Sequence, residues 1–167
     1  MQKMQVAGIG LDAARGQAVL LLQESETPRR VLPVWVGLPE AVAIDRESRH
    51  QRAPRPPTHQ LIGDVVRALG RRLDEVRITE LRGGVFFAEL ALDHQATVSA
   101  RVSDAVALAV HLDVPIYAAE AVLDEAAHDV PVAETEQPTV PSEAEQAEEI
   151  ERFRRLLDSA SPEDFER

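Results

Sequence analysis

The sequence predicts an α+β fold, in which helices pack on a mainly antiparallel or mixed sheet in a single domain and an amphipathic helix follows at the C-terminal end. Two stretches, 7–36 and 76–100, contain the alternating patterns and short apolar runs that are typical of strands. Two others, 58–69 and 103–110, have apolar residues at helical spacing. A chain of 167 residues is long enough for one domain and short for two of ordinary size.

Three strands are predicted to open the domain. The first alternates apolar residues with smaller or polar ones over Ala7, Ile9 and Leu11, and two short apolar runs follow at 18–22 and 31–36. A helix is predicted next, since a proline and a glutamate at 39 and 40 suit its first turn, and it is expected to end before residue 50.

A basic connector, 46–59, links this helix to the next. It contains three prolines and four arginines, Arg46, Arg49, Arg52 and Arg55. The connector predicts either a solvated loop or a surface that contacts phosphates. The helix that follows is predicted to begin with Thr58 as its cap and to stop at Gly70.

The second half of the domain predicts an antiparallel meander from 76 to 100, with turns at 82–84 and 93–94. Ser103 is the predicted cap of the next helix, and a strand at 115–118 and a short helix from 120 to 126 close the domain. The core residues predicted for the second half and for the preceding helix are Leu61, Val65, Leu69, Phe86, Leu90, Val98, Val106 and Val110.

The chain is predicted to divide into a domain (1–130), a Pro- and Glu-rich linker (131–141) and an acidic helical tail (142–167). The apolar stripe of the tail helix consists of Ile150, Phe153, Leu156 and Leu157. It predicts docking on its own domain or pairing with a copy in a homo-oligomer, in preference to a dedicated protein partner. Removal of linker and tail is expected to leave a folded domain. Of the net charge of −11, residues 124–167 hold 14 acids and 4 bases, so the acidity belongs to the tail.

Composition excludes several classes of site. The chain has no cysteine, which excludes disulfides, thiolate metal sites and a cysteine nucleophile. Its one lysine, Lys3, is not part of a phosphate-binding loop. With aromatic residues at 4%, a rigid aromatic binding face is not expected. No segment suits a signal peptide or a membrane span, so the expected location is the cytoplasm.

Three segments in register, 32–44, 55–59 and 100–109, resemble the bifunctional nuclease family. The resemblance extends over about 5–127, and the tail resembles that of actinobacterial members. It implies phosphodiester hydrolysis in DNA and RNA with a divalent metal, Mg²⁺ or Mn²⁺. The chain departs from the family pattern with Gln60 where an acid is common, Val102 where proline is usual, and Asp-Arg-Glu at 45–47 where small apolar residues are usual. If the common acid at this position carries a metal or a proton in relatives, this chain, with Gln60, is expected to be weakened or inactive.

Four residues are the candidates for chemistry. His59, Arg101 and Asp104 are the candidate catalytic residues, and Glu40 and Asp104 are the candidate metal ligands. Each also has a structural interpretation: Asp104 and Glu40 favour the positive ends of helix dipoles, Arg101 pairs with Asp104, and His59 anchors a helix start.

Two functions follow. One is a metal-dependent nuclease of low sequence specificity, with the four connector arginines on phosphates. The other is a non-catalytic regulatory or protein-interaction domain, which the single lysine and the few aromatic residues favour. Clustering of the four candidates in space would support the nuclease, whereas scattering would support the interaction domain.

Overall fold

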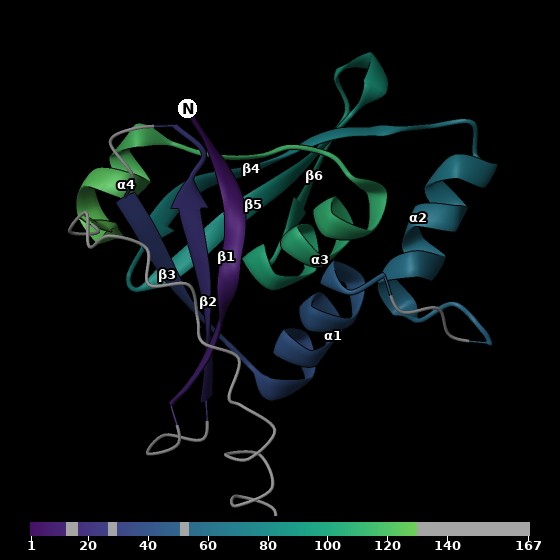
Figure 1. Ribbon diagram of the computed structural model, residues 1–167. Helices are drawn as coiled ribbons and strands as arrows, with labels where there is room; N and C mark the ends of the chain where they lie inside the picture. The colour runs from purple at the N-terminus through teal and green to yellow at the C-terminus, as the bar shows by residue number, and fades with distance from the viewer. Residues whose placement is uncertain (13–16, 27–29, 51–53, 130–167) are drawn as a thin grey trace, which may run out of the picture. The chain divides into compact units, whose positions relative to one another are not determined.

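The computed structural model describes residues 1–12, 17–26, 30–50 and 54–129 (Figure 1). These residues form the predicted α+β fold, with one mixed sheet and four α-helices. The elements in chain order are β1 (Gln2–Asp12), β2 (Gln17–Glu24), β3 (Arg30–Val36), α1 (Leu38–Ser48), α2 (Thr58–Ala68), β4 (Leu73–Arg82), β5 (Val85–Leu92), the 3₁₀ turn η1 (Asp93–Gln95), β6 (Thr97–Ala100), α3 (Val102–Leu112), β7 (Ile116–Ala118), α4 (Glu120–Ala126) and β8 (His128–Asp129). The predicted linker (131–141) and helical tail (142–167) lie outside the described residues.

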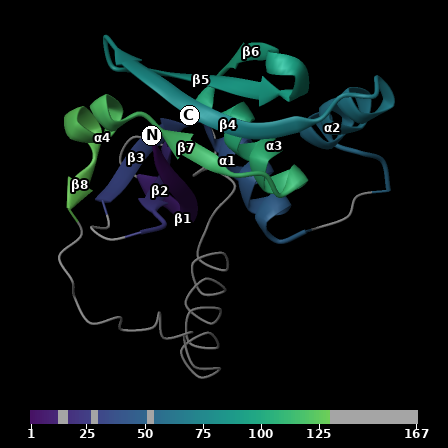
Figure 2. The same ribbon diagram turned by 90° about the horizontal axis from the view of Figure 1, so that it is seen from above.

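The sheet has the order β6-β5-β4-β7-β1-β2-β3-β8. All neighbouring strands are antiparallel except β4 and β7, which pair in parallel through Val76 and Ile116. The short strand β7 therefore joins two antiparallel sets, β1–β3 and the meander β4–β6, into one sheet (Figure 2). The first set was predicted from one alternating stretch and two short apolar runs, and the second from alternation and turns. The strand that joins them was predicted as the last strand, whereas the short strand β8 follows it in the structure.

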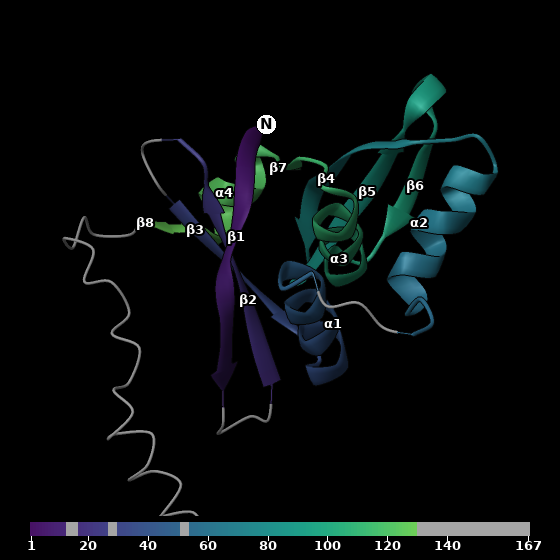
Figure 3. The same cartoon turned by 45° about the vertical axis from the view of Figure 1, so that its right-hand side comes forward.

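Helix α3 is the centre of the helical layer. It packs against β4 and β5, and both α1 and α2 border it (Figure 3). Seven of its eleven residues are buried, including Val106, which has no exposed surface. Phe86, Leu90 and Val110 are partly buried against the same core, as predicted. No helix in the described part of the chain is long and apolar enough to cross a membrane.

The predicted burial of the apolar stripe of α2 is wrong. Leu61, Val65 and Leu69 are 50%, 49% and 72% exposed, and Val98 on the edge strand β6 is 50% exposed. The helix instead packs through Gly63, where an added Cβ would lie 3.1 Å from Leu112 Cδ2 and 3.3 Å from His111 Cδ2 of α3. A Cβ at this position would be a tight contact that the Leu112 and His111 side chains would have to yield to, so the glycine face rather than the apolar face turns inward.

The two predicted helix caps are also wrong. Helix α2 is preceded by Pro57 and helix α3 by Arg101, and neither residue makes a side-chain cap hydrogen bond. Thr58 and Ser103 lie within the first turns, and Ser103 is buried. The extended backbone at Pro57 and Arg101 starts each helix without help from a side chain. The predicted stop at Gly70 is confirmed by its φ of +70°.

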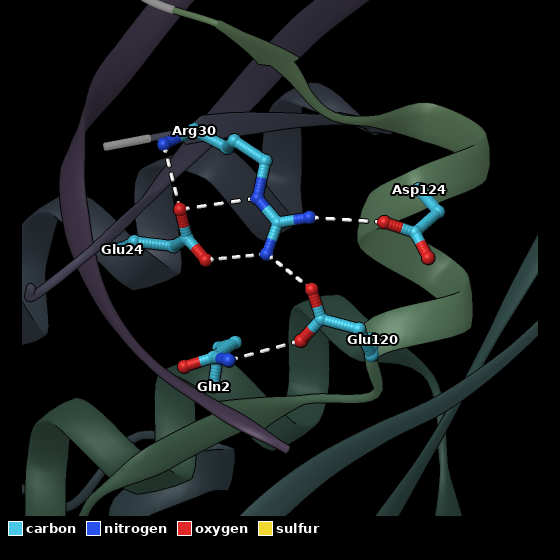
Figure 4. Close-up of polar contacts among 5 residues, drawn as sticks. All are labelled: Gln2, Glu24, Arg30, Glu120 and Asp124. Atoms are coloured by element: carbon cyan, nitrogen blue, oxygen red, sulfur yellow. Dashed lines mark hydrogen bonds and ion pairs between the residues drawn. The ribbon is translucent and has the colours of Figure 1, made fainter. Parts of the chain in front are cut away.

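An ion-pair cluster joins both ends of the β2–β3 connection to α4 (Figure 4). The Arg30 guanidinium donates to both carboxylate oxygens of buried Glu24, at 2.7 and 3.1 Å, and the Arg30 backbone N–H donates to Glu24 at 2.8 Å. The same guanidinium reaches Glu120 at 2.6 Å and Asp124 at 3.1 Å. Gln2 of β1 donates to Glu120 at 2.9 Å. Arg30 therefore links the end of β2 to α4 through its ion pairs.

Candidate functional site

The four candidate residues lie together in one cluster. Arg101 Nε donates to Asp104 Oδ2 at 2.7 Å, and its Nη2 donates to Asp104 Oδ1 at 3.1 Å. Arg101 Nη1 donates to Glu40 Oε1 at 3.0 Å. His59 Nε2 lies 3.1 Å from Asp104 Oδ1. A continuous polar chain, Glu40–Arg101–Asp104–His59, thus connects residues that are up to 64 positions apart in the sequence.

Each member of this cluster stands at the start of a helix. Glu40 lies in the first turn of α1, His59 in the first turn of α2, and Asp104 in the first turn of α3. Arg101 is the residue directly before α3. Gly37 makes room for the first of these, because a Cβ at that position would lie 2.3 Å from Glu40 Oε2. The cluster is therefore built where the amino ends of three helices converge, and those positive dipole ends favour its carboxylates.

The charges in the cluster support one another. The hydrogen bonds from Arg101, and then the bond with His59, hold the pKa of Asp104 below its usual range, although partial burial opposes the shift. Asp104, followed by Glu40, raises the pKa of Arg101. Because an ionised carboxylate only accepts hydrogen bonds, His59 Nε2 must carry a proton. In the neutral ring, the lone pair of His59 is then on Nδ1.

The cluster does not fit a metal centre held by protein donors alone. Glu40 and Asp104 were expected to be metal ligands, but the Arg101 guanidinium lies between them and donates to both. Among the described residues, no group of three or more histidine, aspartate or glutamate side chains is placed to hold a metal ion. A cation at this point would have to displace Arg101 or tolerate its charge.

Among the described residues, the connector arginines Arg46, Arg49 and Arg55 are not hydrogen-bonding partners of this cluster. Arg46, Arg49 and Arg55 are exposed, and Arg49 Nε donates to Asp45 at 2.9 Å. Arg46 stands in the last turn of α1, about 9 Å along the helix axis from Glu40. Arg52 lies outside the described residues. A phosphate role for these arginines stays a prediction.

A second polar network, which the sequence did not reveal, lies between the same three helices. Glu47 of α1 is 4% exposed and accepts two hydrogen bonds from Gln60 Nε2 of α2, both at 3.1 Å. His111 Nδ1 of α3 lies 3.0 Å from Glu47 Oε2. Glu47 and His111 each follow a residue of the first cluster, Glu40 and Asp104, by seven positions, which is about two helical turns. The second network therefore extends the first along the α1–α3 interface.

A pocket of about 390 Å³ opens beside Glu40 and Arg101. Its walls come from the end of β3, the β4–β5 hairpin and the start of α3, and they include Trp35, Val85 and Phe86. Trp35 is 50% exposed. The strand pattern contained the signal, because Leu32, Val34 and Val36 are buried and the tryptophan between them must point to the other face.

Comparisons with known proteins match this chain to one family and to two relatives. The bifunctional nuclease domain matches residues 20–131. The chain belongs to the bifunctional nuclease domain family. Two Mycobacterium tuberculosis proteins, "Uncharacterized protein MT1877" of strain CDC 1551 and "Uncharacterized protein Rv1829" of strain H37Rv, are each 45% identical to it over 165 residues, which is 99% of this chain and 98% of the relative.

Gln60 and Glu47, two positions at which the chain was expected to depart from the family pattern, contact each other in the structure. Gln60 Nε2 donates to both carboxylate oxygens of Glu47. An acid at 60 would face the Glu47 carboxylate at hydrogen-bond distance, where like charges repel. At this point between the helices, the negative charge therefore comes from α1 in this chain.

Gln60→Glu is expected to lower the free energy of unfolding at pH 7.5 by roughly 1–2 kcal/mol, because a donor becomes a second carboxylate beside buried Glu47. The loss is expected to shrink at pH 5, where one of the two carboxyls can take up a proton and donate. Urea unfolding at both pH values measures this difference. Gln60→Met, which loses the donor without adding charge, is the control and should show no comparable recovery on acidification. Equal stability of Gln60→Glu and the parent at pH 7.5 would contradict the network.

Proposed function

We propose that this protein is a nuclease of low sequence specificity that hydrolyses phosphodiester bonds in DNA and RNA at the Glu40–Arg101–Asp104–His59 cluster. The observation that carries the proposal is the geometry of the last three residues. A histidine oriented by a carboxylate stands beside an arginine whose side chain is 67% exposed. A planar guanidinium binds phosphate oxygens well, and an imidazole can accept a proton near neutral pH. The family name, which describes a nuclease, supports the same chemistry.

Because DNA has no 2′-hydroxyl, one mechanism for both nucleic acids cannot use that group as the nucleophile, and water is the nucleophile of the proposed mechanism. His59 Nδ1 accepts the proton of the water whose oxygen forms the new bond to phosphorus. The bond from phosphorus to the leaving ester oxygen breaks, and that oxygen takes up a proton from solvent. Arg101 stabilises the negative charge that develops on the phosphate oxygens. Asp104 keeps the proton of the His59 ring on Nε2, and Glu40 fixes the other side of the Arg101 guanidinium.

A magnesium or manganese ion that arrives with the substrate is the alternative source of positive charge. Magnesium commonly binds through one or two carboxylates together with substrate phosphates, and Glu40 and Asp104 are the two carboxylates at hand. Both would then have to leave Arg101. We favour Arg101 as the source of the positive charge, because it already donates hydrogen bonds to both carboxylates and a metal ion would have to break them.

The test is cleavage of single-stranded DNA, RNA and duplex by the purified protein with Mg²⁺, with Mn²⁺ and with EDTA. We expect cleavage of the single-stranded substrates, and we expect it to continue in EDTA. Asp104→Asn protein, purified in the same way, measures any contaminating nuclease. Cleavage that requires Mg²⁺ or Mn²⁺ would show that a metal ion, and not Arg101, supplies the positive charge.

A non-catalytic interaction or regulatory domain is the second candidate. The observation that favours it is that the charged side chains of the cluster already satisfy one another, as they would in a purely structural link between three helices. Absence of cleavage by the folded protein under all three conditions would select this function.

A further inference from the structure

The pocket beside Arg101 has the chemistry of a site for a flat aromatic ligand. Its volume of about 390 Å³ lies in the range of small-molecule sites. Trp35 supplies an aromatic ring that is 50% exposed, and Val85, at 57% exposed, and Phe86 supply further apolar surface. Glu40 and Arg101 supply the charged groups of the same wall. A ligand that fits must combine a flat π surface with an anionic group.

The position of the pocket limits the class of ligand that it can bind. Arg101 and Glu40 belong both to the pocket and to the cluster that is proposed to cleave phosphodiesters. A phosphate held by Arg101 therefore has the pocket beside it, where the nucleoside of the same nucleotide would lie. Bases stack on aromatic side chains with little preference for sequence, since every base has a π face. The bases of a duplex are already stacked and paired, so the pocket suits a single strand.

We propose that this pocket binds one nucleobase of single-stranded DNA or RNA, stacked against Trp35, while Arg101 holds the adjacent phosphate. The proposal rests on the proposed nuclease function and names its substrate form: an unpaired nucleotide, recognised by stacking. The Glu40 carboxylate, which can accept hydrogen bonds from base amino groups, lies on the polar side of the pocket.

The chain has a single tryptophan, so its fluorescence reports directly on the pocket. We titrate the full-length parent protein with adenosine 5′-monophosphate, with ribose 5-phosphate and with inorganic phosphate. Adenosine monophosphate is expected to quench Trp35 in a saturable way, whereas the two ligands without a base leave the fluorescence unchanged. Equal responses to adenosine monophosphate and ribose 5-phosphate would overturn the stacking site.

Variants test the same site with labelled single-stranded DNA. Trp35→Ala is expected to weaken binding about tenfold, while Trp35→Phe keeps most of the affinity because a ring remains. Phe87→Ala is the matched control. Phe87 follows Phe86 in β5, is 37% exposed and lies against the Arg82 guanidinium, but it is not part of the pocket. Equal affinity of Trp35→Ala and Phe87→Ala would overturn the proposal. If Trp35→Ala does not fold, Trp35→Phe and the titrations of the parent protein still test whether a base stacks on Trp35.

The outcomes separate this inference from the proposed function. Quenching by adenosine monophosphate in a protein that cleaves nothing would keep the base site and reject the nuclease. Cleavage without any difference between adenosine monophosphate and ribose 5-phosphate would keep the nuclease and reject the base site. Asp104→Asn, which is expected not to cleave, should still bind single-stranded DNA with its tryptophan quenched.

Discussion

His59→Ala is expected to lower the rate of cleavage of single-stranded DNA and RNA by about 10²–10⁴-fold, because it removes the group that takes the proton from water. His59 contributes one hydrogen bond to Asp104 at 3.1 Å, so the free energy of unfolding should fall by no more than about 1–2 kcal/mol. Steady-state cleavage rates and urea unfolding of the same preparations measure the two effects separately.

Two further variants sharpen this expectation. His59→Gln retains a side-chain donor for Asp104 but offers no base, so it should lose cleavage as His59→Ala does while staying closer to the parent in stability. His128→Ala changes an exposed histidine of β8 and is the matched control, expected to cleave at the parent rate. A parent-like rate for His59→Ala would reject His59 as the base. A rate that falls only in proportion to the unfolded fraction would reject it as well.

The members of the candidate site and the Arg101–Asp104 pair were predicted from the sequence, whereas the contacts that join the three helices were not. Glu40, His59 and Asp104 could each be assigned to a first helical turn from local signals, namely a proline at a helix start or a polar residue before an apolar stripe. That the three first turns converge depends on how α1 and α2 pack against α3, and no local signal encodes that packing. The contact of Arg101 with Glu40, 61 positions away, is the clearest example.

The fold shows the same division. Alternation predicted the first strand and the antiparallel meander, because side chains on opposite faces meet different surroundings, and short apolar runs predicted the second and third strands. The stripe of α2 predicted a helix correctly but its orientation wrongly, since amphipathicity shows that an apolar face exists and not that anything covers it. Gly63 indicates which face of α2 turns toward α3, because a helix approaches its neighbour most closely through its smallest residue.

Glu47 is the buried charge that a closer reading of the pattern would have found. It follows Ile44 by three positions and Glu40 by seven, so it shares their face of α1, and Ile44 is fully buried. A glutamate on that face needs a partner. The partners, Gln60 and His111, come from two other helices, and only the structure identifies them.

Arg30→Met is expected to lower the free energy of unfolding at pH 7 by about 3 kcal/mol, because it leaves the buried Glu24 carboxylate without its cation. The methionine keeps much of the apolar volume of the arginine stem. The backbone N–H of residue 30 still donates to Glu24, which places the loss at the lower end of what breaking a buried pair costs. Urea unfolding measures it, and Arg72→Met is the control, since the Arg72–Asp74 pair has side chains 76% and 41% exposed and should show no comparable loss.

The dependence on pH identifies the cause of that loss. In the parent protein the hydrogen bonds from Arg30 lower the pKa of Glu24 below its ordinary value of 4.5. The stability from this pair is therefore fully present above about pH 4.5 and is lost as the pH falls through the lowered pKa. In Arg30→Met the hydrogen bonds from the guanidinium are lost, whereas burial, which raises the pKa of Glu24, and the backbone N–H of residue 30, which lowers it, both remain. The pKa of Glu24 is therefore higher than in the parent, so acidification neutralises the carboxylate more readily and relieves the variant. The difference between parent and variant should shrink from pH 7 to pH 4. The double variant Glu24→Gln/Arg30→Met should be more stable at pH 7 than Arg30→Met alone, and a double variant as unstable as the single one would show that lost packing, not an unpaired charge, is responsible.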